Sequence, residues 1–461
     1  MDGLNCKEIT LNEALSNKDK RIDSQFWTTH ISKNPKYTYL KIGSAILSSQ
    51  YGMSIDMNTE NKGYPIFRMN ELHHMLTDLE VEKYANVSSM DYRAYALEDK
   101  DVLFNRTNSY EWVGRTGIYY KNDDTPFTYA SYLVKFVPDS SIILPEYLTT
   151  FLNTEIGVKA IKARARQSVN QTNVNPEEVK EIEIPLLSMD FQKAIEKLFL
   201  MANQKRVHAR DLYKRAVCML HNHLDIQQKN TYSSHSEKLL SESFVLSGRF
   251  DAEYYDLKYD HIESQVVGDN TVRNSCILYD SNYVPADNIE YKYIELANVD
   301  DAGGISDVEV LLGAKLPSRA RRLVKAGQVV VSSIEGSLSS CALITSEYDN
   351  AICSTGFYVV NSNKYNSETL LLLFKSEAVQ AMLKKRCSGT ILTAISKDEF
   401  EKMPLPEVED SVQKDIAAII QESFSLRDDS KKLLNLAIKS VEMAIEKDED
   451  IALAWLKGEA R

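Results

Sequence analysis

Cations and side-chain amides stand next to one another in the first half of this sequence. Lys159, Lys162, Arg164 and Arg166 fall in a stretch without acidic residues that continues into the amide-rich run 167–173 (QSVNQTN). Lysine and arginine attract phosphate whatever the base sequence, whereas asparagine and glutamine can form paired hydrogen bonds with adenine, and arginine with guanine. Together these residue types favour a surface that binds nucleic acid.

Similar polar groups recur in the second half. Cations at 384–386 (KKR) precede the short polar run 388–390 (SGT), and an acid-free cluster of cations extends over 315–325. Polar runs also directly follow predicted strands, at 105–109 (NRTNS) and at 332–337 (SSIEGS). The second run carries less positive charge. In both places the sheet would position the polar side chains. The residues that we expect to contact DNA are Arg68, Asn70, Arg106, Thr107, Asn108, Ser109, Lys162, Arg164, Arg166, Gln167, Asn170, Gln171, Asn173, Arg319, Arg321, Arg322, Ser332, Ser333, Lys385, Arg386, Ser388 and Thr390.

Known catalytic signatures are missing from the sequence. It contains no G-x-x-x-x-G-K-[ST], no G-x-G-x-x-G, no H-E-x-x-H and no adenine methyltransferase motif of the Asn-Pro-Pro-Phe kind. The paired histidines at 73–74 and 221–223 lack cysteine or acidic support at a ligand spacing. We therefore expect neither catalysis nor a metal site on this chain.

The sequence contains an internal repeat. Residues 21–27 (RIDSQFW) correspond to 249–255 (RFDAEYY), and 97–104 (LEDKDVLF) correspond to 324–331 (VKAGQVVV), at offsets of 228 and 227 positions. Further matches keep the same order, so chance similarity of apolar patches is a poor explanation. A run of charge is usually only a solvated face. Recurrence of the basic run at the duplicated position favours a function, because a face without a role would be freer to differ.

Each repeat is predicted to be a mixed globular part followed by one long helix. Short strands at 101–106, 116–120 and 131–136 and a helix over 146–166 predict an α+β fold for the first globular part. Residues 190–227 contain neither Gly nor Pro and carry apolar residues at helical spacing. The stretch from Val412 to Ile445 in the second repeat has the same character.

A helix of about 35 residues spans roughly 50 Å, longer than a typical domain is wide. Its apolar stripe needs a partner, for which the duplicate helix is the simplest candidate; the alternative is two surface helices, each packed on its own domain. We expect two tandem globular domains of mixed helix and strand, with two long helices that pair as a coiled coil, in an internal repeat. The predicted boundaries are 1–188 and 231–408 for the domains, 189–230 and 409–447 for the helices, and 448–461 for a tail.

Overall charge and cysteine content set further bounds. The net charge of −12 argues at first sight against nucleic acid, but the acids cluster in segments such as 177–183 and 446–450, so local patches decide the question. Six scattered cysteines without a C-x-x-C pair fit a reducing cytoplasm. The sequence shows no secretion signal and no apolar run of about 18 residues, so we expect a cytoplasmic protein without a membrane partner.

Several short motifs are spread along the sequence. They are the segments 50–54 (QYGMS), 63–69 (GYPIFRM), 101–108 (DVLFNRTN), 113–114 (VG), 167–174 (QSVNQTNV), 184–186 (IPL) and 403–406 (MPLP). These motifs and their layout resemble those of the specificity subunits of type I restriction-modification systems, over nearly the whole length. In the second half 330–333 (VVSS) replaces the LFNRT pattern, so base contacts there are assigned by position alone.

The resemblance implies an α+β fold with two tandem α/β target-recognition domains, separated by two long antiparallel coiled-coil helices in a pseudo-twofold internal repeat. Each domain would read one half of a bipartite site on double-stranded DNA. The resemblance also implies that the long helices space the halves and dock two methyltransferase subunits, and that a restriction and translocase subunit joins through the complex. In such a complex S-adenosylmethionine, ATP and Mg²⁺ would act on partner subunits that methylate adenine N6 and cleave DNA. This chain would be a non-catalytic subunit without a cofactor of its own.

Three other interpretations stay open. The chain could be a protein-interaction scaffold, with two recognition domains on a helical strut and incidental basic patches. It could be an enzyme with an unrecognised site, or a DNA-binding subunit of a standalone methylase or of another phage-defence complex. Steep salt dependence of DNA binding would argue against the scaffold. Methylation by the chain alone would favour the enzyme.

Overall fold

The structure of the protein is a computed structural model that describes residues 6–16, 20–169, 171–227, 237–241, 243–306, 308–389 and 393–459. Two of the candidate residues, Asn170 and Thr390, lie outside the described residues. The chain divides into two compact units. Unit 1 comprises Met1–Val207 and Leu426–Arg461, and unit 2 comprises His208–Ser425. Each unit therefore contains one half of each of the two long helices.

Unit 1 is built on a six-stranded sheet in which the central strand β8 (Val102–Asn105) is buried at every residue. β8 pairs antiparallel with β12 (Leu133–Pro138) and with β10 (Thr116–Ile118). The sheet is completed by β2 (Ile46–Tyr51), β6 (Leu76–Thr77) and β5 (Leu72–His73) in the order β2-β12-β8-β10-β6-β5. The predicted strands at 101–106, 116–120 and 131–136 are confirmed with slightly shifted ends.

Two helices follow this sheet where one was predicted over 146–166. The chain forms α4 (Pro145–Asn153) and α5 (Glu155–Arg164), separated by Thr154 in extended backbone conformation. Thr154 ends α4 and serves as the N-cap of α5, since its Oγ1 accepts a hydrogen bond from Gly157 N at 3.1 Å. Apolar residues continue at helical spacing through the break, so periodicity alone did not reveal it.

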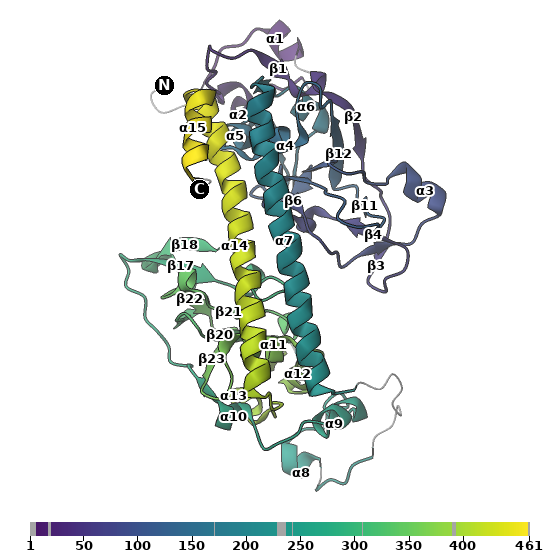
Figure 1. Ribbon diagram of the computed structural model, residues 1–461, viewed down its shortest axis with the longest axis vertical. Helices are drawn as coiled ribbons and strands as arrows, with labels where there is room; N and C mark the ends of the chain where they lie inside the picture. Colours follow the sequence, from purple (N-terminus) through teal and green to yellow (C-terminus); the bar gives the residue numbers. More distant parts are fainter. Residues whose placement is uncertain are drawn as a thin grey trace. The chain divides into compact units, whose positions relative to one another are not determined.

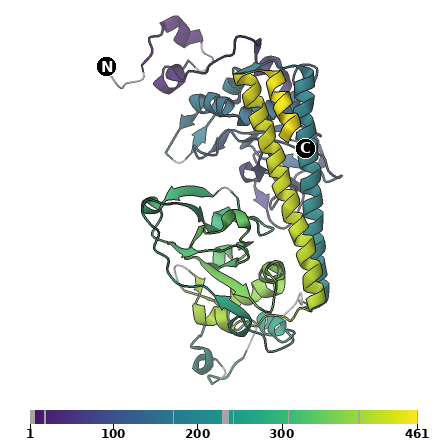
Figure 2. The same ribbon diagram turned by 60° about the vertical axis from the view of Figure 1, so that its left-hand side comes forward.

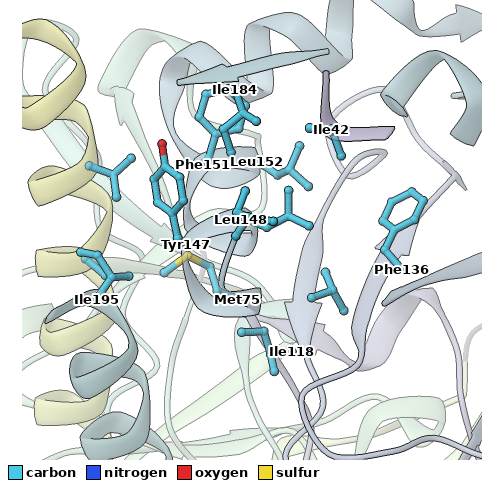
Figure 3. Packing of buried hydrophobic residues seen from close by; sticks show 14 of the residues in the cluster. Ile42, Met75, Ile118, Phe136, Tyr147, Leu148, Phe151, Leu152, Ile184 and Ile195 are labelled. Carbon is cyan, nitrogen blue, oxygen red and sulfur yellow. The ribbon is translucent and has the colours of Figure 1, made fainter. Parts of the chain in front are cut away.

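Helix α4 supplies the centre of the hydrophobic core in unit 1 (Figure 3). Tyr147 is fully buried, and its hydroxyl donates to Pro185 O at 2.7 Å. Leu148 and Phe151 pack in the same cluster as Ile195 of the long helix α7 (Met189–Leu224). The core thereby joins the sheet, α4 and the first part of α7 into one body.

Unit 2 has two four-stranded sheets and a similar pair of helices, α11 (Ser367–Lys375) and α12 (Glu377–Lys385). Ser376 separates the two helices and caps α12, as Thr154 caps α5. The sheets are β16 (Cys276–Leu278), β23 (Phe357–Ser362), β20 (Val329–Ser332) and β21 (Cys341–Leu343), in that order, and β18 (Glu309–Leu312), β17 (Glu290–Ile294), β22 (Ile352–Ser354) and β19 (Ala320–Leu323), in that order.

The smaller elements complete the two units (Figure 1). In unit 1 they are α1 (Leu11–Ser16), α2 (Ser24–Thr28), α3 (Ser89–Ala94), α6 (Pro176–Lys180), α15 (Glu449–Glu459), β1 (Tyr39–Lys41) paired with β15 (Glu183–Pro185), the sheet of β11 (Thr128–Tyr129), β4 (Tyr64–Phe67), β7 (Tyr84–Ala85) and β3 (Met57–Asn58), and the sheet of β13 (Arg166–Gln167), β14 (Thr172–Asn173) and β9 (Thr107–Asn108). In unit 2 they are α8 (Phe244–Ser247), α9 (Leu257–Glu263), α10 (Val272–Ser275), α13 (Lys397–Lys402) and the pair β24 (Cys387–Ser388) and β25 (Ala394–Ile395).

Both predicted long helices are present, α7 and α14 (Asp410–Glu446), and they lie side by side in both views (Figures 1 and 2). In unit 1, Ser430 Oγ donates to Ala202 O at 2.9 Å. In unit 2, Ser423 Oγ donates to Ala209 O at 2.7 Å. A serine of α14 therefore bonds a backbone carbonyl of α7 in each unit.

Small buried residues recur every seven positions on both long helices. Such residues let two helix backbones approach closely, and the heptad keeps them on one seam. On α7 they are Ala202, Ala209 and Ala216, and on α14 they are Ser423, Ser430, Ala437 and Ala444. No helix among the described residues is long and apolar enough to cross a membrane.

The two units repeat the same hydrogen bonds where a long helix begins. In unit 1, Gln192 Oε1 accepts from Leu144 N at 2.8 Å, and its Nε2 donates to Leu187 O at 3.0 Å. In unit 2, Gln413 Oε1 accepts from Asn366 N at 2.9 Å, and its Nε2 donates to Val408 O at 2.9 Å. The glutamine thus fixes the loop before α4 or α11 to the first turn of α7 or α14.

Candidate nucleic-acid interface

A three-stranded sheet in unit 1 brings together two of the segments singled out in the sequence. β14 pairs antiparallel with β13 on one side and with β9 on the other. Thr107 lies opposite Asn173, and its Oγ1 donates to Asn173 Oδ1 at 2.6 Å. The polar loop that follows β8 and the amide-rich run that follows α5 therefore form one surface.

The hairpin of β13 and β14 projects its polar side chains outward. Ser168 N donates to Gln171 O at 2.8 Å and closes the hairpin. Arg166, Gln167 and Gln171 are exposed, and Val169 at the tip is 96% exposed. The hairpin thus presents a cation, two amides and an apolar tip to the surroundings.

Strand β9 adds further polar groups beside this hairpin. Arg106 N donates to Tyr132 O at 3.0 Å, and the Arg106 guanidinium lies 5.1 Å from the centre of the Tyr51 ring. Asn108 Oδ1 accepts from Ser109 N at 2.8 Å, and Ser109 is exposed. Arg106, which directly precedes β9, is therefore held by the segment before β12 and by an aromatic ring, while Ser109 is exposed.

The ammonium group of Lys162 bonds backbone oxygens of the protein itself. Its Nζ donates to the backbone oxygens of Tyr110, Glu111 and Val113, at 3.1 Å for Glu111 and 2.9 Å for Val113. Burial lowers the pKa of Lys162 to about 8, against the opposing effect of the Glu111 carboxylate. Lys162 ties the end of α5 to the turn at 109–113.

Arg164 is also partly buried. Its Nη1 donates to Ala160 O at 2.9 Å, its guanidinium lies 5.6 Å from the centre of the Phe26 ring, and burial lowers its pKa. In the described part of α5 and the hairpin, the cations with exposed side chains are Lys159 and Arg166.

The matching cations of unit 2 are paired with acids. Lys385 Nζ lies 3.1 Å from Asp260 Oδ1 and 2.6 Å from Glu263 Oε2. Arg386 Nη2 lies 2.7 Å from Glu263 Oε1. Both side chains are about nine-tenths buried, so they brace α12 against α9.

The serines proposed for unit 2 lie beside its hairpin of β24 and β25. Ile395 N donates to Ser333 O at 2.9 Å, which joins this hairpin to the segment after β20. Ser332 and Ser333 are buried, and Ser388 is exposed. The arrangement of unit 1 recurs here, with Ile334 opposite Ala394 where unit 1 has Thr107 and Asn173.

The three arginines near β19 form a separate group. Arg319 Nη2 donates to Glu295 Oε1 at 2.7 Å, and Arg322 Nη1 donates to Asn282 Oδ1 at 2.6 Å. Arg321 Nε donates to Ser318 O at 2.9 Å. β19 and β24 belong to different sheets, so these arginines are carried by a sheet other than that of the hairpin.

Arg68 and Asn70 lie just after β4, in a sheet other than that of the hairpin in unit 1. The Arg68 guanidinium pairs with Glu71 and, at 3.3 Å, with Glu82. Asn70 is exposed.

Sequence reasoning missed an aromatic loop beside the hairpin of unit 1. Tyr110 and Trp112 are each 39% exposed, and the Arg115 guanidinium lies 3.5 Å from the centre of the Trp112 ring. Exposed aromatic rings next to cations can stack on bases. The signal was present in the sequence, since both aromatic residues directly follow the polar run 105–109.

No protein family model matches the chain. It is 28% identical, over 148 residues, to the putative type I restriction enzyme MjaX specificity subunit of Methanocaldococcus jannaschii, a region that covers 32% of this chain and 35% of that protein. It is 23% identical, over 184 residues, to the type I restriction enzyme EcoKI specificity subunit of Escherichia coli K12, covering 38% and 39%. The matched regions thus span little more than a third of these relatives.

Solved structures with some likeness to this chain include the S subunit of a type I restriction-modification system from M. genitalium. The match has 13% identity and a TM-score of 0.41, and covers 90% of this chain and 97% of that one. A second is the HsdS subunit from Thermoanaerobacter tengcongensis, with 12% identity, a TM-score of 0.31, and coverage of 90% and 98%.

Proposed function

Because this chain is related to the specificity subunits of type I restriction enzymes, we propose that it selects the DNA site on which such a complex acts. Each unit would read one half of a bipartite double-stranded target. The hairpin of β13 and β14, with β9 beside it, would contact the first half-site, and the hairpin of β24 and β25 would contact the second.

The observation that carries this proposal is the polar surface formed by β13, β14 and β9. It combines an exposed cation, Arg166, with exposed amides at Gln167 and Gln171, on strands whose backbone is fixed by pairing. Cations supply phosphate contacts, and amides held in a defined orientation can distinguish bases in the major groove. A surface of this kind is suited to reading sequence as well as to binding the DNA backbone.

The long helices would set the distance between the half-sites. We propose that α7 and α14 pack as an antiparallel coiled coil and dock two methyltransferase subunits. The heptad spacing of small buried residues supports the coiled coil, as do the hydrogen bonds from Ser423 to Ala209 and from Ser430 to Ala202. A restriction and translocase subunit would join through the methyltransferases.

In this proposal the chain supplies binding and no chemistry. S-adenosylmethionine, ATP and Mg²⁺ would be bound by the partner subunits, which would methylate adenine and cleave unmodified DNA. The sequence lacks the phosphate-binding and methyltransferase motifs that such chemistry needs.

Single-molecule sequencing of DNA from cells that express this chain with a neighbouring methyltransferase tests the proposal. The expected result is methylated adenine in a motif split by a fixed gap, absent from a control without this chain. If both proteins are soluble and associated but no motif appears, the proposed function is wrong.

A further inference from the structure

The segment that begins each repeat folds into the same small structure, which we call the latch: residues 21–27 in unit 1 and 249–255 in unit 2. In unit 1, Arg21 Nε and Nη2 donate to the two carboxylate oxygens of Asp23, at 2.6 and 2.9 Å. Asp23 Oδ1 also accepts from Phe26 N at 3.1 Å and so caps α2. Trp27 Nε1 donates back to Arg21 O at 2.8 Å.

The latch of unit 2 repeats these bonds in detail. Arg249 Nε and Nη2 donate to Asp251 at 2.7 and 2.8 Å, and Asp251 Oδ1 accepts from Tyr254 N at 3.1 Å. Tyr255 OH donates to Arg249 O at 3.1 Å, in the role that Trp27 has in unit 1. One geometry is thus built twice with different aromatic residues.

Both arginines of the latches lie inside the protein. The Arg21 side chain is 6% exposed and that of Arg249 is 14% exposed. Each guanidinium also faces an aromatic ring of its own latch, with Arg21 5.1 Å from the Phe26 ring centre and Arg249 4.3 Å from the Tyr254 ring centre. The carboxylates are less buried, with the Asp23 side chain 44% and that of Asp251 45% exposed. A bidentate pair anchored on a buried guanidinium is nevertheless more rigid than an isolated surface ion pair. Because they are enclosed, the latch arginines are poorly placed to contact DNA themselves.

In unit 1 the latch contacts the junction between α5 and the hairpin, and α2 lies beside α5 (Figure 1). Gln25 Nε2 donates to Lys162 O, in the last turn of α5, at 3.0 Å. The Phe26 ring packs under the Arg164 guanidinium at 5.6 Å. Two residues further on, β13 begins at Arg166.

In unit 2 the latch contacts the equivalent junction between α12 and its hairpin. Arg249 Nη2 donates to Cys387 O, in the first residue of β24, at 2.7 Å. The Tyr254 ring lies 5.4 Å from Lys385 Nζ, and Glu253 lies 3.8 Å from Lys384 Nζ. We call the hairpins β13–β14 and β24–β25 the recognition hairpins. In each unit the latch therefore contacts the junction between the recognition hairpin and the helix that precedes it.

We propose that the latches are positioning elements for target reading: Arg21 with Asp23, and Arg249 with Asp251, set the orientation of the hairpin in their own unit. This inference rests on the proposed function. Each latch lies within one unit, so its loss should affect only the half-site that this unit reads. A role in general folding would instead lower all activity without regard to half-site.

The test uses the full chain in complex with its methyltransferase, with the variants Asp23→Asn and Asp251→Asn. Neutralising the carboxylate removes the ionic part of the bidentate pair while keeping nearly the same shape. Methylated sites are mapped by single-molecule sequencing. For Asp23→Asn we expect at least a tenfold fall in the preference for the correct bases in one half of the motif, with the other half and the gap unchanged. Asp251→Asn should give the reverse pattern.

Matched controls break exposed ion pairs elsewhere in each unit. Asp124→Asn removes the pair with Lys121 in unit 1, and Glu347→Gln removes the pair with Lys292 in unit 2. Both controls should methylate the wild-type motif with unchanged selectivity.

A milder variant covers the case in which Asp23→Asn fails to fold. Gln25→Ala leaves the Arg21–Asp23 pair intact and removes the bonds from Gln25 Nε2 to Lys162 O and, at 3.5 Å, to Tyr110 OH. It should therefore cause a smaller loss confined to the same half-site. Unchanged selectivity in folded Asp23→Asn and Gln25→Ala proteins, or an equal loss in both half-sites, would overturn the latch proposal. Absence of any motif with the wild-type chain would instead overturn the proposed function.

Discussion

At the scale of single residues, the cations of the candidate interface fall into two groups: those that bond the protein itself and those exposed to solvent. Lys162 and Arg164 bind carbonyl oxygens of their own chain, whereas Arg166 and Lys159 are exposed. A basic run in the sequence thus contains both structural cations and cations suited to phosphate. The difference can be tested because the two kinds of side chain should respond differently to substitution.

Arg166→Ala should weaken DNA binding for all sequences alike, because phosphate contacts carry no sequence information. The slope of log affinity against log salt concentration should become shallower by about 1. Arg164→Ala should also weaken binding, with an added loss of thermal stability because the Arg164 side chain is largely buried.

Gln171→Ala, in contrast, should relax specificity in one half-site at an almost unchanged salt slope, as should substitution of Asn170. DNA binding measured over a salt series on matched and mismatched targets distinguishes these results.

Lys162 predicts a pH effect on stability. Burial lowers its pKa to about 8 in the folded chain, below the ordinary value of 10.5, so the folded chain holds this proton more weakly than the unfolded chain. The resulting penalty is fully present below about pH 8 and is relieved as the pH rises toward 10.5. The free energy of unfolding of the wild type should therefore rise relative to that of Lys162→Met between these pH values. Parallel denaturant titrations of the two proteins would show no such divergence if Lys162 were solvated.

The sequence predicted where polar side chains gather but not which of them bind the chain itself. The three carbonyl partners of Lys162 come from a turn about fifty positions earlier in the chain. The acids that pair with Lys385 come from α9, more than a hundred positions away. Partners this remote depend on the tertiary fold, and no local pattern around a lysine encodes them.

At the scale of elements, the long helices could be predicted from the sequence. A long segment without Gly or Pro that carries apolar residues at helical spacing can form few structures other than a helix. The break at Thr154 did not follow from the sequence, since apolar residues continue at helical spacing on both sides of it. The recognition hairpins were also not predicted as strands. Their two-residue strands are too short to show an alternating pattern.

The seam between the helices yields a second prediction about stability. Ala209→Leu should lower the free energy of unfolding by about 1–3 kcal/mol or more, because the added side chain has no room beside the fully buried Ser423. Gln204→Leu, at an exposed position of α7, should change it by less than about 0.5 kcal/mol. Equal effects of the two substitutions in thermal or chemical denaturation would show that the seam tolerates large residues.

At the scale of the whole molecule, the proposed role of the long helices as a spacer has a numerical consequence. Deleting residues 203–209 and 424–430 together removes seven residues from each helix and brings Ser423 opposite Ala202, so the small-residue seam is preserved. Each helix shortens by about 10 Å, the length of about three base pairs at roughly 3.4 Å each. The methylated motif should keep both half-sites and lose about three base pairs of its gap. Deleting four residues from each helix breaks the heptad and serves as the control, which should lose activity.

Unit 1 is assembled from two segments far apart in the chain, whereas unit 2 is one continuous segment. The core of unit 1 includes Leu434, Val441 and Leu456, which lie more than two hundred positions beyond its sheet. During synthesis on a ribosome, therefore, the half that is translated first cannot complete its core until the second half has emerged. Unit 2 would therefore be able to fold before unit 1. Until residues 426–461 have been synthesised, residues 1–207 would expose apolar surface, and we expect chaperones to bind them during this time.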